Sequence, residues 1–130
     1  MKFHHVALSI ADVDRTLEFY GHFGLTKTLD MTTDDGQLRI IQLSDDAYRI
    51  ELFWSPAMKP TPVTDEFAGE INRTGLKHVG FWSDNLDADL PALAKVGIKP
   101  CTEVMQARSM STRYLFFRDP DGHWVELMGK

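Results

Sequence analysis

Apolar and polar residues alternate at the start of this chain, and the same pattern returns later. The alternation predicts a strand over residues 3–10, with His5 on the face opposite the aliphatic side chains. Asp12 is then a predicted helix N-cap, and Gly24 is placed to end that helix. The pattern therefore predicts a strand followed by an amphipathic helix.

Three more apolar stretches predict strands, and turn-forming residues separate them. These strands are expected near residues 25–31, 38–43 and 48–54, so the first part of the chain has the order βαβββ. Residues 55–75 contain three prolines and no strand period, which indicates a linker. A short helix is expected in that linker near residues 65–72.

The second half of the sequence repeats the first. A shift of 73 positions superimposes a strand histidine, a helix cap, three helix residues and a helix-ending glycine. The pairs are His5 and His78, Asp12 and Asn85, Val13 and Leu86, Asp14 and Asp87, Leu17 and Leu90, and Gly24 and Gly97. We therefore predict an α+β fold in which two βαβββ modules, residues 1–54 and 76–130, form a single domain over 1–130. Their curved mixed sheets are expected to share a cleft.

Composition limits the class of protein. The 130 residues suit one compact domain, and 43% hydrophobic with 25% charged residues is ordinary for a globular protein. A net charge of −5 argues against nucleic acid and anionic membranes as partners. The single cysteine, Cys101, excludes an internal disulfide and is expected in the core. Without a signal-like or membrane-spanning apolar run, we expect a cytoplasmic protein.

Two glutamates stand within apolar strands, where an unpaired buried charge would be costly. Glu51 and Glu126 lie 75 positions apart, which is close to the repeat length. Strand parity places both of them, with His5 and His78, on the faces opposite the aliphatic side chains. These two histidines and two glutamates form a nitrogen and oxygen set suited to a divalent transition metal, which would neutralise the carboxylates.

Other residues compete for these roles. His4 is the alternative to His5, but it shares the parity of the aliphatic residues and is the weaker candidate. His22 in the helix and His123 beside the turn are expected to be solvated. Three tryptophans either line a substrate pocket or serve ordinary packing, and the sequence does not choose: Trp54, Trp82 and Trp124.

Several segments resemble the vicinal oxygen chelate superfamily, which contains glyoxalase I, bleomycin-resistance proteins and extradiol dioxygenases. They are HHVALSIADVDRTLEFY with GLT, RIELF, GLKHVGFWSDN and FFRDPDGHWVEL. The resemblance implies that each module supplies metal ligands from its first and last strands, namely His5 and Glu51, then His78 and Glu126. It implies one divalent metal per site, Zn or Ni in the first place, with Fe, Co or Mn as alternatives.

The complete ligand set is most similar to that of bacterial glyoxalase I. This implies a metal-dependent lyase or isomerase that acts on a small α-hydroxycarbonyl substrate, in some cases a thiol adduct, through an enediolate. Glu126, with Glu51, would be the catalytic base. The resemblance also favours a homodimer, with modules paired within one chain or exchanged between two. Ser9 replaces an arginine that binds glutathione in the bacterial enzyme, so the metal chemistry is better supported than glutathione.

Two other functional classes remain open. One is another metal-dependent enzyme of the superfamily, such as an epimerase, a thiol transferase or an extradiol dioxygenase. The other is a binding protein of the bleomycin-resistance kind, which sequesters a ligand without catalysis. The full ligand set counts against the binding protein.

Overall fold

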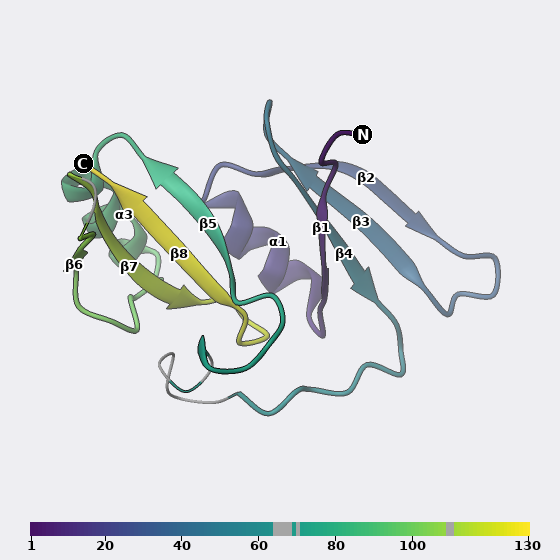
Figure 1. Ribbon diagram of the computed structural model, residues 1–130. Coiled ribbons are helices and arrows are strands. Elements are labelled where there is room, and N and C mark those ends of the chain that lie inside the picture. The colour runs from purple at the N-terminus through teal and green to yellow at the C-terminus, as the bar shows by residue number, and fades with distance from the viewer. Residues whose placement is uncertain (64–68, 70, 109–110) are drawn as a thin grey trace. The chain divides into compact units, whose positions relative to one another are not determined.

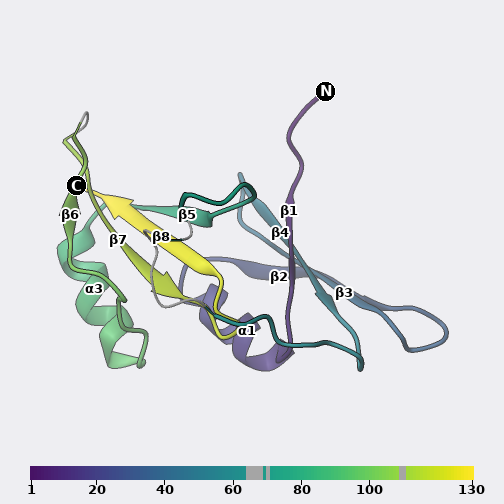
Figure 2. The same ribbon diagram turned by 60° about the horizontal axis from the view of Figure 1, so that its bottom comes forward.

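The computed structural model describes residues 1–63, 69, 71–108 and 111–130 (Figure 1). It divides into two compact units, Met1–Thr61 and Pro62–Lys130. Each unit contains one four-stranded sheet, and the strands within each sheet twist along its length (Figure 2).

The first unit has the predicted order βαβββ. Its elements are β1 (Val6–Ser9), α1 (Val13–Gly21), β2 (Thr26–Thr32), β3 (Arg39–Ser44) and β4 (Arg49–Trp54). The sheet order is β1-β4-β3-β2, in which β1 is parallel to β4 and the other neighbours are antiparallel. The first strand therefore lies directly beside the last, which brings their side chains together.

The second unit repeats this arrangement. Its elements are β5 (His78–Ser83), α3 (Leu86–Lys95), β6 (Met105–Gln106), β7 (Arg113–Arg118) and β8 (Trp124–Gly129). The order β5-β8-β7-β6 again places the first strand parallel to the last. The predicted pair of βαβββ modules with mixed sheets is confirmed.

Helices α1 and α3 begin and end as the repeat predicted. The Asp12 carboxylate accepts a hydrogen bond from the Arg15 backbone N–H at 3.1 Å, and the Asn85 side chain accepts one from Ala88 at 3.2 Å. These bonds satisfy backbone donors that the first turn of a helix leaves free. Past the helix ends, Gly24 and Gly97 adopt φ values of 88° and 85°, which favour glycine.

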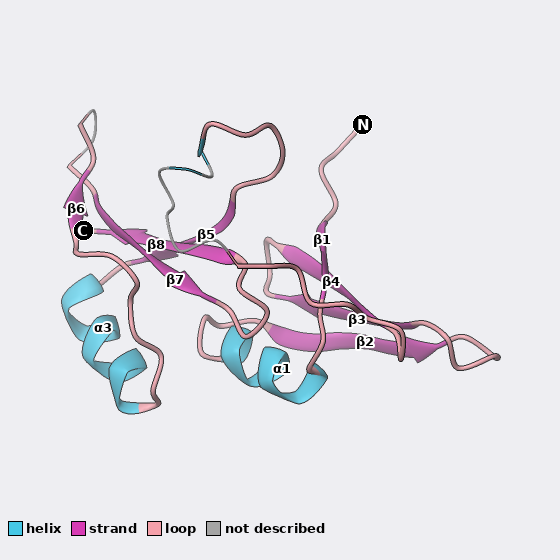
Figure 3. Ribbon diagram, turned by 90° about the horizontal axis from the view of Figure 1, so that it is seen from below, coloured by secondary structure: helices cyan, strands magenta, loops and turns pink. Residues whose placement is uncertain are grey.

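Strand parity separates a buried face from a more open one in both sheets. Leu8 in β1 and Leu52 in β4 are buried, and so are Val125 and Leu127 in β8. Figure 3 shows α1 on one side of the first sheet and α3 on one side of the second. The glutamates Glu51 and Glu126 alternate with these buried side chains and lie on the opposite faces, as predicted.

Some local predictions need correction. The first strand begins at Val6 and not at residue 3. Cys101 is exposed and lies outside the strands, so its placement in the core was wrong. Its backbone N–H donates to the Phe116 carbonyl at 2.7 Å, so the chain is held beside β7 while the thiol faces solvent. The helix expected near residues 65–72 falls mostly on residues outside the described part.

The boundary between the units lies inside the predicted linker, at Thr61 and Pro62. The prediction of a single domain over residues 1–130 stays a prediction. Within the described part of the chain, no helix has the length and apolar character needed to cross a membrane.

Candidate metal centre

The first histidine and glutamate meet at the parallel junction of β1 and β4. In the strand register Glu51 lies opposite Ala7, two residues after His5. The His5 Nε2 and Glu51 Oε2 atoms are 3.6 Å apart, with the side chains 34% and 19% exposed. Sequence parity predicted that these two side chains share a face, and the structure brings them together.

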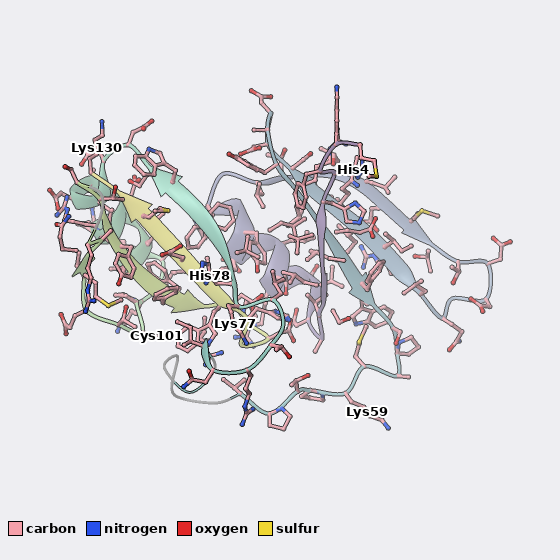
Figure 4. The ribbon with its side chains drawn as sticks, viewed as in Figure 1. His4, Lys59, Lys77, His78, Cys101 and Lys130 are labelled. Carbon is pink, nitrogen blue, oxygen red and sulfur yellow. The ribbon has the colours of Figure 1, made fainter. Side chains whose placement is uncertain are left out.

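The second pair occupies the same place in the other sheet. Glu126 on β8 lies opposite Gly80 on β5, again two residues after the histidine. His78 Nε2 and Glu126 Oε2 are 3.2 Å apart, with the side chains 33% and 16% exposed (Figure 4). Each module therefore holds one imidazole nitrogen beside one carboxylate oxygen, and both remain accessible to solvent.

The spacing within each pair fits two ligands of one metal ion. With bonds of about 2.1 Å, two ligands of a tetrahedral ion lie roughly 3.4 Å apart. The observed separations of 3.6 Å and 3.2 Å lie on either side of that value. The longer separation is beyond a normal hydrogen bond. Donor type and spacing therefore both fit a divalent transition metal.

Each pair by itself is an incomplete site. Among residues 1–63, 69, 71–108 and 111–130, no group of three or more His, Cys, Asp or Glu side chains gathers to hold a metal. Structural and catalytic zinc sites have at least three protein ligands. A site with all four predicted ligands would need both pairs, and that combination stays a prediction.

The residues around each glutamate differ between the sheets. The register places eight same-face positions around Glu126, of which four are aromatic apart from His78. They are His78, Gly80, Trp82, Tyr114, Phe116, Arg118, Trp124 and Met128. Around Glu51 the corresponding positions are mainly small, polar or aliphatic: His5, Ala7, Ser9, Ile40, Gln42, Ser44, Arg49 and Phe53.

The aromatic side chains of the second sheet contact one another. The Phe116 ring centroid lies 5.4 Å from that of His78, 6.0 Å from Tyr114 and 6.0 Å from Trp124, all edge to face. The Arg118 guanidinium covers the Trp124 ring at 3.4 Å. These contacts bury Phe116 and Trp124 and hold the His78 ring against a fixed neighbour.

His4 contacts His5 and a neighbouring arginine. The Nδ1 atoms of the two imidazoles are 2.8 Å apart, and His4 Nε2 lies 2.7 Å from Arg49 Nη1. Partners of this kind orient metal-binding histidines. Parity alone did not predict this contact, although the adjacent His-His pair in the sequence was the available signal.

His123 is anchored, whereas the sequence predicted a solvated side chain. Its Nδ1 lies 2.8 Å from Asp119 Oδ2, and the Asp119 carboxylate is fully buried. This hydrogen bond, opposed by partial burial, raises the pKa of His123. Asp119 also accepts the backbone N–H groups of Asp121 and His123, so it organises the turn before β8. The turn thereby directs the strand that carries Glu126.

The remaining candidates take structural or surface positions. The Trp54 indole donates to the Ala11 carbonyl at 3.2 Å, which ties the end of β4 to the start of α1. Trp124 is buried under Arg118, while Trp82 is 52% exposed on the same sheet face as Glu126. His22 is exposed, as predicted.

Comparison with protein families gives a match over nearly the whole chain. The model described as "Glyoxalase/Bleomycin resistance protein/Dioxygenase superfamily" matches residues 2–127. No curated protein gives a match.

Solved structures share the fold at low sequence identity. A glyoxalase family protein from Enterococcus faecalis has a TM-score of 0.79 at 23% identity, covering 98% of this chain and 96% of its own. A glyoxalase I mutant from Zea mays has a TM-score of 0.77 at 22% identity, covering 95% of this chain but 43% of its own. A fosfomycin resistance protein from Listeria monocytogenes has a TM-score of 0.69 at 14% identity, covering 100% and 93%.

Proposed function

The chain belongs to the glyoxalase, bleomycin resistance protein and dioxygenase superfamily, and from this premise we propose that it is a metal-dependent lyase or isomerase. The proposed substrate is a small α-hydroxycarbonyl compound, and the reaction moves a carbon-bound proton through an enediolate. The observation that carries the proposal is the recurrence, in both units, of a histidine and a glutamate at the spacing of two metal ligands.

The proposed metal ligands are His5, Glu51, His78 and Glu126. Imidazole and carboxylate donors suit Zn, Ni, Co, Mn or Fe, and mixed donors of this kind do not select one of them. A bound ion would act as a Lewis acid that polarises the substrate carbonyl and acidifies the adjacent C–H bond. The two pairs would come from one chain or from two chains of a homodimer.

Glu126 is the proposed base. Its carboxylate is 16% exposed and lies beside Gly80, whose missing side chain leaves room next to Oε2. A carboxylate at that place can take a proton from substrate carbon and return it to the neighbouring carbon. Glu51 holds the equivalent place beside Ala7 in the first sheet and is the second candidate.

Ser9 bears on the thiol cofactor. It lies exposed on the Glu51 face of the first sheet, where the resemblance places a glutathione-binding arginine. A serine hydroxyl cannot form the bidentate, charge-assisted contact that arginine makes with a carboxylate. We therefore expect weak use of the methylglyoxal–glutathione hemithioacetal compared with other α-hydroxycarbonyl compounds.

Metal analysis and a substrate panel test the proposal together. Protein purified without chelator should carry a divalent transition metal, and turnover of at least one α-hydroxycarbonyl compound should disappear with chelator and return with metal. The panel includes the hemithioacetal and a catechol, each with metal-loaded and metal-free protein. Absence of bound metal under all loading conditions would overturn the proposal.

The same panel distinguishes the other functional classes. Oxygen consumption with the catechol would identify a dioxygenase in place of a lyase or isomerase. Tight ligand binding without turnover under every metal would identify a sequestering protein. Both outcomes contradict the proposed reaction while leaving the fold unchanged.

A further inference from the structure

The second sheet has an open position immediately beside the proposed base. Gly80 is exposed, and a Cβ atom built on it would lie 3.5 Å from Glu126 Oε2. Glycine inside a strand weakens the strand, and it often marks a place where another group approaches the backbone closely. In the first sheet the same register position is Ala7. The open position left by the missing side chain of Gly80 is therefore a feature of the second sheet alone.

A row of three side chains, Trp82, Met128 and Tyr114, lies beside this open position on the side away from His78. Trp82 follows Gly80 on the same face of β5, and the register places Trp82 opposite Met128 and Met128 opposite Tyr114. Trp82 is 52% exposed, and the other two side chains are partly exposed. Single exposed apolar side chains are ordinary, but adjacent ones that form a patch mark a candidate binding site.

The exposed indole is held in place. Its Nε1 donates to Asp84 Oδ1 at 3.0 Å, which fixes the orientation of the ring. Tyr114 is likewise supported by Phe116, whose ring centroid lies 6.0 Å away. A ring whose orientation is fixed before binding loses less conformational entropy when a ligand packs on it.

The chemistry of the row favours an uncharged occupant. Indole, thioether and phenol groups carry no charge at neutral pH. The Asp84 carboxylate accepts the hydrogen bond of the indole nitrogen, so a negative charge lies at the edge of the Trp82 ring. An anionic group would be repelled there, whereas a flat apolar ring would bury area against all three side chains.

We infer that Trp82, Met128 and Tyr114 bind an uncharged aromatic ring of the substrate, with its α-hydroxycarbonyl end over Gly80 beside Glu126. This inference rests on the proposed function and narrows its substrate class to aryl-substituted α-hydroxycarbonyl compounds. The first sheet has Ser9, Phe53 and Ile40 at the corresponding positions. We therefore place the ring of the substrate on the second sheet.

The test measures ligand binding, which does not depend on turnover. The probes are 2-hydroxyacetophenone, hydroxyacetone and 4-(hydroxyacetyl)benzoate, which present a phenyl, a methyl and a carboxyphenyl group on the same α-hydroxyketone. Calorimetric titration is carried out with metal-free and zinc-loaded protein. We expect the phenyl ketone to bind roughly tenfold more tightly than the methyl ketone, because its ring buries additional apolar area. The benzoate should lose most of this gain.

Two variants test whether ligand binding depends on the Trp82 ring and on the open position at Gly80. Trp82→Ala should remove the preference for phenyl over methyl while leaving the zinc content unchanged. Gly80→Ala should weaken both ketones roughly threefold to tenfold, because its methyl group occupies the space beside Glu126. Tyr48→Ala removes an aromatic side chain that is 69% exposed on the first unit, and this control should leave the phenyl preference unchanged.

The outcomes separate this inference from the proposed function. A zinc-loaded protein that binds both ketones equally, with no effect of Trp82→Ala, would overturn the inference and leave the metal chemistry intact. A protein that takes up no zinc but still prefers the phenyl ketone through Trp82 would overturn the proposed function and leave the aromatic site. Tighter binding of the benzoate than of the phenyl ketone would also overturn the inference.

Discussion

The two sheets share three positions and differ at the others. Both place a histidine, a small residue and a glutamate on adjacent parallel strands, as His5, Ala7 and Glu51 or as His78, Gly80 and Glu126. The six other positions around each glutamate are largely polar or aliphatic in the first sheet and largely aromatic in the second. The shared positions serve metal chemistry in our proposal, and the differing positions determine what else each sheet can bind.

The largest expected effect tests whether the two glutamates are equivalent. Glu126→Gln should lower turnover by roughly 100-fold to 10,000-fold, because an amide cannot accept the substrate proton. The change should affect kcat more than substrate binding. Steady-state kinetics of Glu126→Gln and Glu51→Gln, each loaded with the same metal, provide the measurement. Equal losses in the two variants would remove the assignment of Glu126 as the principal base.

Substitution of a proposed ligand histidine should lower the metal affinity of the protein more than substitution of the adjacent His4. His5→Ala and His78→Ala each remove a proposed ligand, so the affinity for Zn should fall by more than about 100-fold. His4→Ala removes the partner 2.8 Å from His5, and a loss of about tenfold to 100-fold is expected from such a supporting residue. Competition with a zinc chelator measures these affinities. His22→Ala is the control, and a comparable loss there would contradict the assignment.

A third prediction concerns the close packing around Gly129 in the second unit. Gly129 ends β8, and an added Cβ would lie 2.2 Å from the Ser83 carbonyl oxygen and 2.9 Å from Leu86 Cδ1. Gly129→Ala should therefore lower the free energy of unfolding by about 1–3 kcal/mol. Denaturant unfolding provides the measurement, and Gly21→Ala, with no atom within 4 Å of its added Cβ, is the matched control. Similar changes in both variants would show that the close contact is not the cause.

The helix caps should behave alike in the two units. Asp12→Ala and Asn85→Ala each remove a side-chain acceptor from a first-turn N–H. Each substitution should cost about 1 kcal/mol of stability, as measured by denaturant unfolding. Asp12→Asn and Asn85→Asp keep an acceptor and should lose much less. A large loss of stability in only one of the two alanine variants would mean that the two helix caps contribute unequally to stability.

The smallest expected effect concerns the turns before the last strands. Asp45 and Asp119 both accept backbone N–H groups there, but only Asp119 among these two also bonds a histidine side chain, at 2.8 Å to His123. The raised pKa of His123 means that folding favours its protonated form. Its contribution is complete below the unfolded pKa of 6.5 and is lost as pH rises through the higher folded pKa.

His123→Gln should therefore destabilise the protein more at pH 5.5 than at pH 9. The difference should be less than about 1 kcal/mol, because the imidazole is partly exposed to solvent. Denaturant unfolding of the wild type and the variant at both pH values measures it. Tyr48, which follows Asp45 in the first turn as His123 follows Asp119, supplies the control Tyr48→Gln, whose effect should not change with pH. A larger destabilisation at pH 9 would contradict the sign of the pKa shift.

Much of the candidate site could be predicted because strand parity is local. Alternation around Ile50 and Leu52, or around Val125 and Leu127, places the intervening glutamate on the other face whatever the rest of the chain does. The repeat then predicted a histidine on the same face as each glutamate, and the pairing of β1 with β4 and of β5 with β8 brings each histidine beside its glutamate. The contact of His4 with His5 and the anchoring of His123 by Asp119 were not predicted, because these hydrogen bonds depend on side-chain geometry that parity does not describe.

The sequence by itself determined the two βαβββ modules, the helix caps, the helix-ending glycines and the sheet faces of the two histidines and two glutamates. Each of these depends on short-range periodicity or on the backbone preferences of single residues. The tertiary structure alone decided which strands are neighbours, since β1 pairs with β4 and β5 with β8 across many intervening residues. That pairing sets Gly80 beside Glu126 and Trp82 beside Met128. Hydrogen bonding between distant strands determines the register, and the register determines which side chains share a face.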